Sequence, residues 1–289
     1  MRTINRPTLT LILLAFAGCN TPITHEARAH LTFAEQGSLG AMHQMAWLYQ
    51  HGKGVPQNDT LAVSWYQKAA REGFIPAMTD LGWMYENGRG VRQNYAEALT
   101  WYRKVIDDAA QLKEPDSNWI FTNRKFEHQS FQESLDWYTY AINDGIRIAQ
   151  HNIGYAFDKG RGVPINELEA LKWYTKSAER GYPGAFTNIG WLYRNGKVIP
   201  HDETKGADCY RQAAELGDMW GQFNLGLIYA YGKGYPTDFN KAEYWFRKAE
   251  NQGHPGSKAE LQRIEMLKRK ASGSSIMSGI KPILEPITK

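Results

Sequence analysis

The sequence predicts an all-α fold, a solenoid of about six helical hairpins of 36 residues with a helical cap at each end. The first observation is a column of large side chains that recur at that interval: Trp65, Trp101, Trp137, Trp173 and Trp245, with Cys209 in the one gap. The second is a Gly-x-Gly turn, and the third is a polar residue suited to begin a helix, both recurring in the same phase. A period of roughly 20–50 residues is typical of stacked repeats.

Each repeat is expected to begin with a helix A. The repeats are phased at Ala41, Ala77, Lys113 (degenerate), Ala149, Ala185 and Gly221. Helix A carries apolar residues at i, i+3 and i+4, such as Met45, Leu48 and Tyr49, which share one helical face. A small residue follows the first of these positions: Ala46, Gly82, Gly154, Gly190 and Gly226. Glycine within a helix costs about 1 kcal/mol relative to alanine, so these glycines predict a close approach of the backbone of the following helix B.

Helix A is expected to end at the Gly-x-Gly turn, because glycine readily adopts the positive φ that terminates a helix. Helix B then begins after a column of N-cap residues: Asn58, Asn94, Ser130, Asn166, Asp202 and Asp238. A glutamate follows three positions later in three repeats, as in a capping box: Glu97, Glu133 and Glu169. Helix B is expected to end at a further glycine: Gly73, Gly145, Gly181, Gly217 or Gly253.

The third repeat, residues 113–148, departs from this pattern. It lacks the Gly-x-Gly turn and has Pro115 near its start, yet Gly145 keeps the phase. We expect this repeat to fold with a distorted loop between its helices. The helix B that precedes it, from Tyr95, is expected to run long because Ala109 stands where other repeats have glycine.

Both ends of the array are expected to be helical caps. Residues 26–37 match a lone helix B, and residues 257–271 match a helix A that is otherwise polar. A terminal repeat needs such a solvated outer face. The solenoid is therefore predicted to cover residues 29–271, and the Ser-, Gly- and Pro-rich residues 272–289 are expected to be disordered.

The first 28 residues are predicted to be a processing segment followed by a tether. Residues 9–16 form an apolar run that is too short to span a bilayer as a mature helix. The run leads into Ala17-Gly18-Cys19, which resembles a bacterial lipoprotein signal sequence. The resemblance implies a signal peptide of residues 1–18 and lipidation of Cys19. With Asn20 next, it implies a Gram-negative outer-membrane lipoprotein facing the periplasm, tethered by residues 19–28. An ordinary secretory signal is the alternative.

Composition narrows the class of partner. The net charge of +4 is too small for a nucleic-acid binder, which would carry a clustered basic face. The chain has two cysteines, Cys19 and Cys209. If Cys19 carries lipid, no disulfide can form within the chain, and stability must come from packing.

The combined pattern is Ala-x3-Leu-Gly-x2-Tyr-x2-Gly-x-Gly-Val, then Asn/Asp-x3-Ala-x2-Trp-Tyr-x-Lys-Ala-Ala-x2-Gly. It resembles the Sel-one-like repeat over residues 41–256. The fifth repeat departs from it, with Val198 for Gly, Gly206 for Ala and Cys209 for Trp. The resemblance implies a right-handed solenoid akin to tetratricopeptide arrays and a protein-binding adaptor role. Several bacterial members are envelope proteins in host interaction, polysaccharide export or immunity against secreted toxins, and some were labelled β-lactamases.

A second ring column follows the small residue of helix A and is the candidate binding site: Trp47, Trp83, Trp119, Tyr155 and Trp191. Position 83 is rotated by about 200° from Leu81 on a helix, so these rings should lie off the core stripe. By analogy with tetratricopeptide helices, that phase faces the concave surface. Polar residues of neighbouring phases would add contacts to a partner: His43, His151, Glu86, Asp158 and Arg194. The alternative is that the rings pack between adjacent A helices as core.

The sequence offers little for catalysis. The eight histidines show no His-Glu-x-x-His spacing for zinc, and no serine lies in a recognisable nucleophile elbow. Cys209 replaces a core tryptophan, which favours a buried, inert thiol over a nucleophile. We therefore expect no metal, no cofactor and no enzymatic activity.

Together these observations predict a lipid-anchored, periplasm-facing scaffold that binds a protein partner in its concave groove. One form is an immunity protein that neutralises a secreted toxic effector. Another is an assembly factor for a secretion or polysaccharide-export complex. A polysaccharide could also stack on a ring column. The competing class is an enzyme that hydrolyses lactams.

Overall fold

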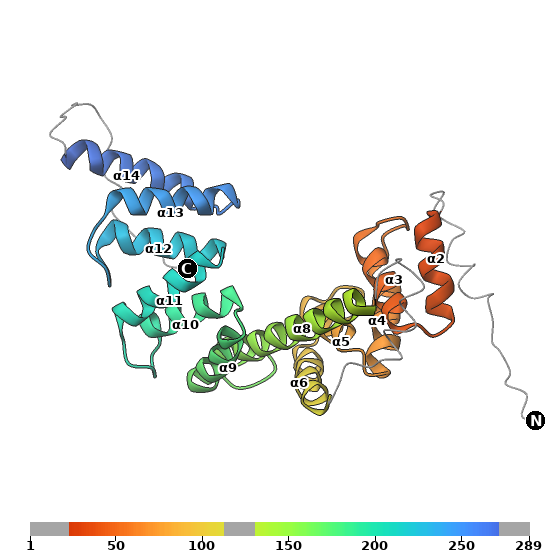
Figure 1. Cartoon of the computed structure of the whole chain (residues 1–289). Coiled ribbons are helices and arrows are strands. Elements are labelled where there is room, and N and C mark those ends of the chain that lie inside the picture. The colour runs from red at the N-terminus through yellow and green to blue at the C-terminus, as the bar shows by residue number, and fades with distance from the viewer. Residues whose placement is uncertain (1–22, 113–130, 272–289) are drawn as a thin grey trace, which may run out of the picture. The chain divides into compact units, whose positions relative to one another are not determined.

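The computed structural model describes residues 23–112 and 131–271, and within those ranges every regular element is a helix (Figure 1). The chain divides into an N-terminal lobe, residues 1–182, and a C-terminal lobe, residues 183–289. The N-terminal lobe contains α2 (His25–Glu35), α3 (Leu39–His51), α4 (Asp59–Arg71), α5 (Ile75–Asn87), α6 (Tyr95–Gln111), α8 (Phe131–Lys159) and α9 (Glu167–Glu179). The C-terminal lobe contains α10 (Pro183–Asn195), α11 (Glu203–Glu215), α12 (Met219–Tyr231), α13 (Phe239–Asn251) and α14 (Ser257–Ala271).

Several predicted features lie outside the described residues. These are the signal sequence with Cys19, the distorted loop of the third repeat with Ser130, the side chains of Trp119, Glu133 and Trp137, and the tail 272–289. The predicted tether also ends sooner than expected. The N-cap Thr24 and the helix α2 from His25 already belong to the fold, because the Thr24 N–H donates to the Gly54 carbonyl at 2.9 Å.

The predicted N-caps are confirmed for every helix B whose cap is described. The side chain of Asn94 accepts a hydrogen bond from the Glu97 N–H at 3.1 Å, and the Asn58, Asn166, Asp202 and Asp238 caps act in the same way. The capping box is wrong at Glu97 and Glu169, because the N–H groups of Asn94 and Asn166 donate to helix A carbonyls. The Asn94 N–H donates to the Tyr85 carbonyl at 2.9 Å, which closes the loop, and the Glu97 carboxylate accepts from the Trp101 indole instead.

The helix A glycines mark a close approach of helix B, as predicted, but the approaching group is chiefly an aromatic ring rather than the backbone. A Cβ at Gly82 would lie 2.6 Å from Cε1 of Tyr102. Gly154, Gly190 and Gly226 meet Tyr174, Tyr210 and Phe246 in the same manner. The core of each hairpin therefore lies between its two helices, where these rings are fully buried or nearly so.

The third repeat differs from expectation. Gly145 does not end a helix, because α8 runs unbroken from Phe131 to Lys159 (Figure 1). A Cβ at Gly145 would lie 2.9 Å from Oγ1 of Thr79, so α8 packs closely on α5 at that point. The second half of α8 serves as helix A of the fourth repeat. The long helix B from Tyr95 is confirmed, since α6 has 17 residues where most other helices of the array have 13.

The fourth repeat stacks directly on the second. The turn of the second repeat lies on the start of α4, where a Cβ at Gly90 would meet the carbonyl of Asp59, 31 positions earlier. The turn of the fourth lies on the start of α6, where a Cβ at Gly162 would meet the carbonyl carbon of Tyr95 at 3.0 Å, 67 positions earlier. The difference is one repeat of 36 residues. The turn of the fourth repeat therefore occupies the position on α6 that is expected for the turn of the third, and we call this arrangement the bypass of the third repeat.

Candidate binding surface

The predicted ring column lies partly at the surface. Trp83 is 37% exposed and Trp191 is 41% exposed, whereas the core Trp65 is 4% exposed. Trp47 and Tyr155 are half-buried. Trp47, Trp83 and Tyr155 belong to the N-terminal lobe, and Trp191 belongs to the C-terminal lobe. Trp83 and Trp191 are therefore not plain core residues.

Each described ring of the column in the N-terminal lobe has a basic side chain beside it, from the Gly-x-Gly turn of its own repeat. The Lys53 ammonium lies 4.7 Å from the Trp47 ring centre, and His51 stacks on the same ring. The guanidinium of Arg89 lies 5.6 Å from the Trp83 ring, and that of Arg161 lies 4.7 Å from the Tyr155 ring. We call these three pairs, Trp47–Lys53, Trp83–Arg89 and Tyr155–Arg161, the ring-and-cation face.

The two arginines of this face are held by the repeat on which they stack. Arg89 makes two hydrogen bonds to the Asp59 carboxylate, at 2.9 and 3.0 Å. Arg161 donates to the Glu86 carboxylate at 3.1 Å, and its guanidinium also lies 5.1 Å from the ring of Tyr95. A charged hydrogen bond fixes the cation over its ring, so the exposed ring and the cation form one preorganised surface.

Three predicted contact residues serve the interior instead. The Tyr102 hydroxyl donates to Glu86 at 3.0 Å, and the Tyr174 hydroxyl donates to Asp158 at 3.4 Å. The guanidinium of Arg194 lies 5.9 Å from the Tyr210 ring. The three residues share a phase in which helix A faces the helix B ring. Glu86, Asp158 and Arg194 therefore join the two helices of a hairpin.

The cavity beside the Glu86–Tyr102 contact has little room for a ligand. Glu86, Tyr102 and Arg161 enclose about 10 Å³ together with Asn152, room for roughly one water. Burial first, and then the Glu86 charge, raise the pKa of the Tyr102 hydroxyl well above its ordinary value. The hydroxyl therefore stays protonated and keeps donating at physiological pH.

The two predicted histidines both pack against aromatic rings. His43 Nε2 lies 2.8 Å from the Asp80 carboxylate, and its ring contacts Tyr66 and Phe74. His151 contacts the rings of Tyr174 and Tyr182 and lies 3.0 Å from the Asn152 side-chain oxygen. Neither residue lies in a cluster of three metal-binding side chains, and none exists elsewhere in the described ranges.

Cys209 has the environment of an inert thiol. The residue is half-buried, and burial, with a smaller contribution from the Asp208 charge, raises the pKa of its thiol to about 11. The thiolate is the nucleophilic form of cysteine. At neutral pH almost none of it forms here, so this position is poorly suited to nucleophilic catalysis.

The hairpin geometry and the recurring turns agree with a family model. The model described as the Sel1 repeat matches residues 40–74, 75–107, 147–182, 187–218 and 221–254. The chain belongs to the Sel1 repeat family. The matched ranges omit residues 108–146. Sel1 repeats form all-α solenoids of helical hairpins, and such scaffolds typically serve protein interaction without catalysis.

Solved structures include Sel1 relatives. A Sel1 repeat protein from Oxalobacter formigenes is 32% identical over 75% of each chain, with a TM-score of 0.55. A protective antigen of uropathogenic Escherichia coli is 29% identical over 82% of this chain and 51% of its own, with a TM-score of 0.41. An immunity protein from Pseudomonas aeruginosa is 18% identical over 74% of this chain and 81% of its own, with a TM-score of 0.39. Of these three structures, the Oxalobacter formigenes protein alone has a TM-score above 0.5, so it alone supports the fold.

Two negative findings complete this description, one from a comparison with known proteins and one from the helices themselves. A search of the curated proteins found no match. Among the described helices, none is both long and apolar enough to cross a membrane.

Proposed function

We propose that this Sel1 repeat protein is a non-catalytic scaffold that binds another protein through the ring-and-cation face of its N-terminal lobe. The observation that carries the proposal is Trp83, a large ring that stays 37% exposed while Arg89 is fixed beside it by Asp59. Trp, Tyr and Arg are the residue types that dominate the binding energy of protein interfaces. Rigid rings also lose little conformational entropy when a partner binds.

The location that we propose is the periplasmic side of a Gram-negative outer membrane. The support is the segment Ala17-Gly18-Cys19-Asn20, with a lipid on Cys19 as the anchor. Replacing Cys19→Ser is expected to move the protein from the membrane fraction to the soluble fraction. Unchanged membrane association of the variant would reject the anchor.

In that location, we propose a secreted toxic protein as the partner, neutralised by capture. A component of a secretion or polysaccharide-export complex is the second candidate. Capture from envelope extracts, followed by mass spectrometry, separates the two by the identity of the bound protein. The captured protein is then purified, and its dissociation constant is measured with each variant below.

Two tryptophans of the same lobe make a matched pair for the decisive measurement. Trp83→Ala is expected to weaken partner binding by at least tenfold with little change in melting temperature, since its ring is an exposed hot-spot candidate. Trp65→Ala removes a ring that is 4% exposed, and is expected to cost about 3–5 kcal/mol of stability. If Trp83→Ala lowers the melting temperature as Trp65→Ala does and leaves binding intact, the ring belongs to the core and the proposal fails.

The enzyme alternative has its own test. Incubation of the purified protein with a chromogenic lactam is expected to give no turnover above the uncatalysed rate. Turnover that a single side-chain change abolishes would replace the scaffold proposal with an enzyme.

A further inference from the structure

One turn of the array has a positively charged residue at a position where the other described turns have proline. In four of the five described turns, the second residue after the position of the Gly-x-Gly motif is proline: Pro56, Pro164, Pro200 and Pro236. The turn between α5 and α6 has Arg92 there. Proline suits a turn of fixed φ, so the repeat explains the prolines and leaves Arg92 unexplained.

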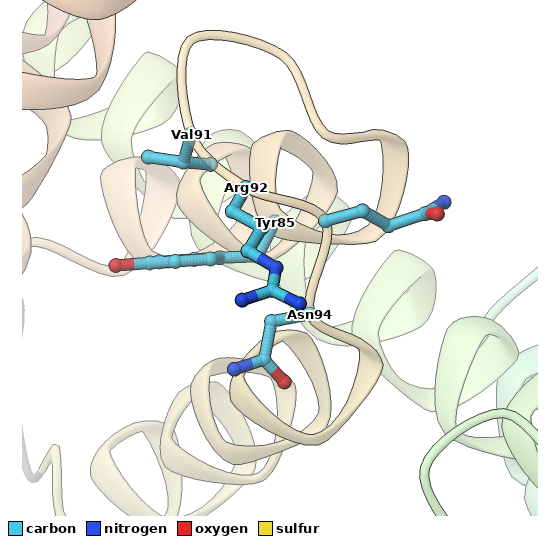
Figure 2. Close-up of a pocket in the computed structure, with 5 residues that line it drawn as sticks. Tyr85, Val91, Arg92 and Asn94 are labelled. Atoms are coloured by element: carbon cyan, nitrogen blue, oxygen red, sulfur yellow. The ribbon is translucent and has the colours of Figure 1, made fainter.

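Arg92 lies at a cleft of about 520 Å³, lined also by Tyr85, Val91, Gln93 and Asn94. Figure 2 shows its guanidinium between the Tyr85 ring and the Asn94 carboxamide, with Val91 on the other side of the ring. No acidic side chain is among the lining residues, and in the described ranges no hydrogen bond or ion pair of Arg92 occurs. The cleft thus combines an apolar wall with an uncompensated cation.

Of the side-chain amides at the cleft, some groups already make hydrogen bonds within the protein and one is available to a ligand. Gln93 Nε2 donates to the Glu86 carbonyl at 2.8 Å and to the Tyr95 hydroxyl at 2.9 Å. Gln57 makes the first of these bonds in its own repeat, so Gln93 has a structural role. Asn94 Oδ1 caps α6, which leaves its Nδ2 group as a second donor at the cleft. Arg92 and Asn94 Nδ2 are therefore the groups that a ligand can engage.

We propose that this cleft binds a carboxylate attached to a small apolar group, carried by the partner polypeptide. A guanidinium presents a planar fork of donors that matches the two oxygens of a carboxylate. The Tyr85 and Val91 side chains would pack against the apolar group beside it. The volume is that of a site for a small ligand or a chain end. The identity of the carrier rests on the proposed function, whereas recognition of the carboxylate does not.

The probe is N-acetyl-leucine, titrated into the full chain labelled with nitrogen-15 at Arg and Asn. We expect saturable shifts of the Arg92 Nε–H and Asn94 side-chain resonances, with a dissociation constant on the order of millimolar for so small a ligand. N-acetyl-leucine amide, which lacks only the charge, is expected to bind at least tenfold more weakly. N-acetyl-glutamate amide tests whether a side-chain carboxylate serves as well as a chain end.

Two variants complete the experiment. Arg92→Pro restores the residue of the other turns, so it is expected to fold, and it should abolish the Asn94 shift. Arg103→Ala removes an exposed cation of α6 outside the cleft and should leave the titration unchanged. Equal binding of the acid and its amide, the absence of saturable shifts, or an unchanged titration of Arg92→Pro would overturn the proposal. Each of these results is independent of whether Trp83→Ala affects partner capture.

Discussion

Two junctions in the N-terminal lobe bring equivalent residues together across different lengths of chain. Where the second repeat stacks on the first, Arg89 binds Asp59, 30 positions earlier. Where the fourth repeat stacks on the second, Arg161 lies over Tyr95, 66 positions earlier. Asp59 and Tyr95 hold the same place, the first residue of helix B. The contact between a turn and a helix start therefore defines the stack, and a repeat-long segment can be bypassed without altering it.

The stacking of the repeats bears on the proposed binding surface, because it determines which rings lie next to one another. With the third repeat bypassed, Arg161 of the fourth repeat binds Glu86 of the second, on the same helix as Trp83. The Tyr155–Arg161 pair therefore lies at the junction directly beside the repeat that carries Trp83–Arg89. The ring-and-cation face is continued across the bypass.

The largest expected effect comes from filling the turn glycines. We expect Gly90→Ala to lower the free energy of unfolding by about 2–4 kcal/mol. Its φ of +68° alone costs alanine roughly 1–2 kcal/mol, and its Cβ would press on the Asp59 carbonyl. Gly162→Ala should cost a similar amount, because its Cβ would lie 2.9 Å from the Ala96 nitrogen.

Gly73→Ala is the control for these variants. Its φ is +88°, but nothing lies within 4 Å of the added Cβ, so only the cost of the backbone conformation remains. Urea unfolding followed by circular dichroism compares the three. A Gly162→Ala variant no less stable than Gly73→Ala would mean that the fourth turn does not rest on α6.

A smaller effect distinguishes a continuous α8 from a helix that ends at Gly145. In a Thr79→Ala background, which removes the nearest side chain, Gly145→Ala should raise stability by about 1 kcal/mol, the helix preference of alanine over glycine. The same unfolding assay applies. A loss of stability like that of Gly73→Ala would indicate a left-handed helix terminus at this position.

The smallest effect concerns the turn itself. Arg92→Pro should raise the free energy of unfolding by about 0.4–1 kcal/mol, because proline restricts the unfolded chain and the equivalent turns already contain it. Differential scanning calorimetry of the variant against the wild type measures this. A variant less stable than the wild type would show that the second turn has a backbone unlike that of the turns with Pro56 and Pro164.

Much of the fold could be predicted because its signals are local. Asn94 and Gly88 begin and end helices through contacts within a few residues of themselves, and the ring column around Trp83 follows from helical phase. Gly145 could not be judged in this way, because glycine permits both a terminus and a helix interior. Its packing on Ile75 and Thr79 favours the interior, and that contact is distant in sequence.

The geometry of the proposed binding surface could be predicted only in part. The rings were found from their phase, but the cations beside them were missed, although Lys53, Arg89 and Arg161 all stand between the two glycines of a turn. The phase of Glu86 and Asp158, next to that of the rings, predicts partner contacts, whereas both carboxylates accept hydrogen bonds within their own hairpins. The tyrosines in the helix B column, Tyr102 and Tyr174, carry the hydroxyls that bind them, and the spacing of 16 residues recurs in both repeats.

A double-mutant cycle between Arg161 and Glu86 tests the bypassed stack, and with it the continuity of the ring-and-cation face, most directly. Unfolding free energies are measured for Arg161→Ala, Glu86→Gln, the double variant and the wild type. A matched cycle between Arg89 and Asp59 reports the regular junction. We predict that both cycles give a coupling of about 0.5–1.5 kcal/mol, as expected for residues in direct contact. Coupling in the Arg89–Asp59 cycle alone, with none between Arg161 and Glu86, would contradict the account.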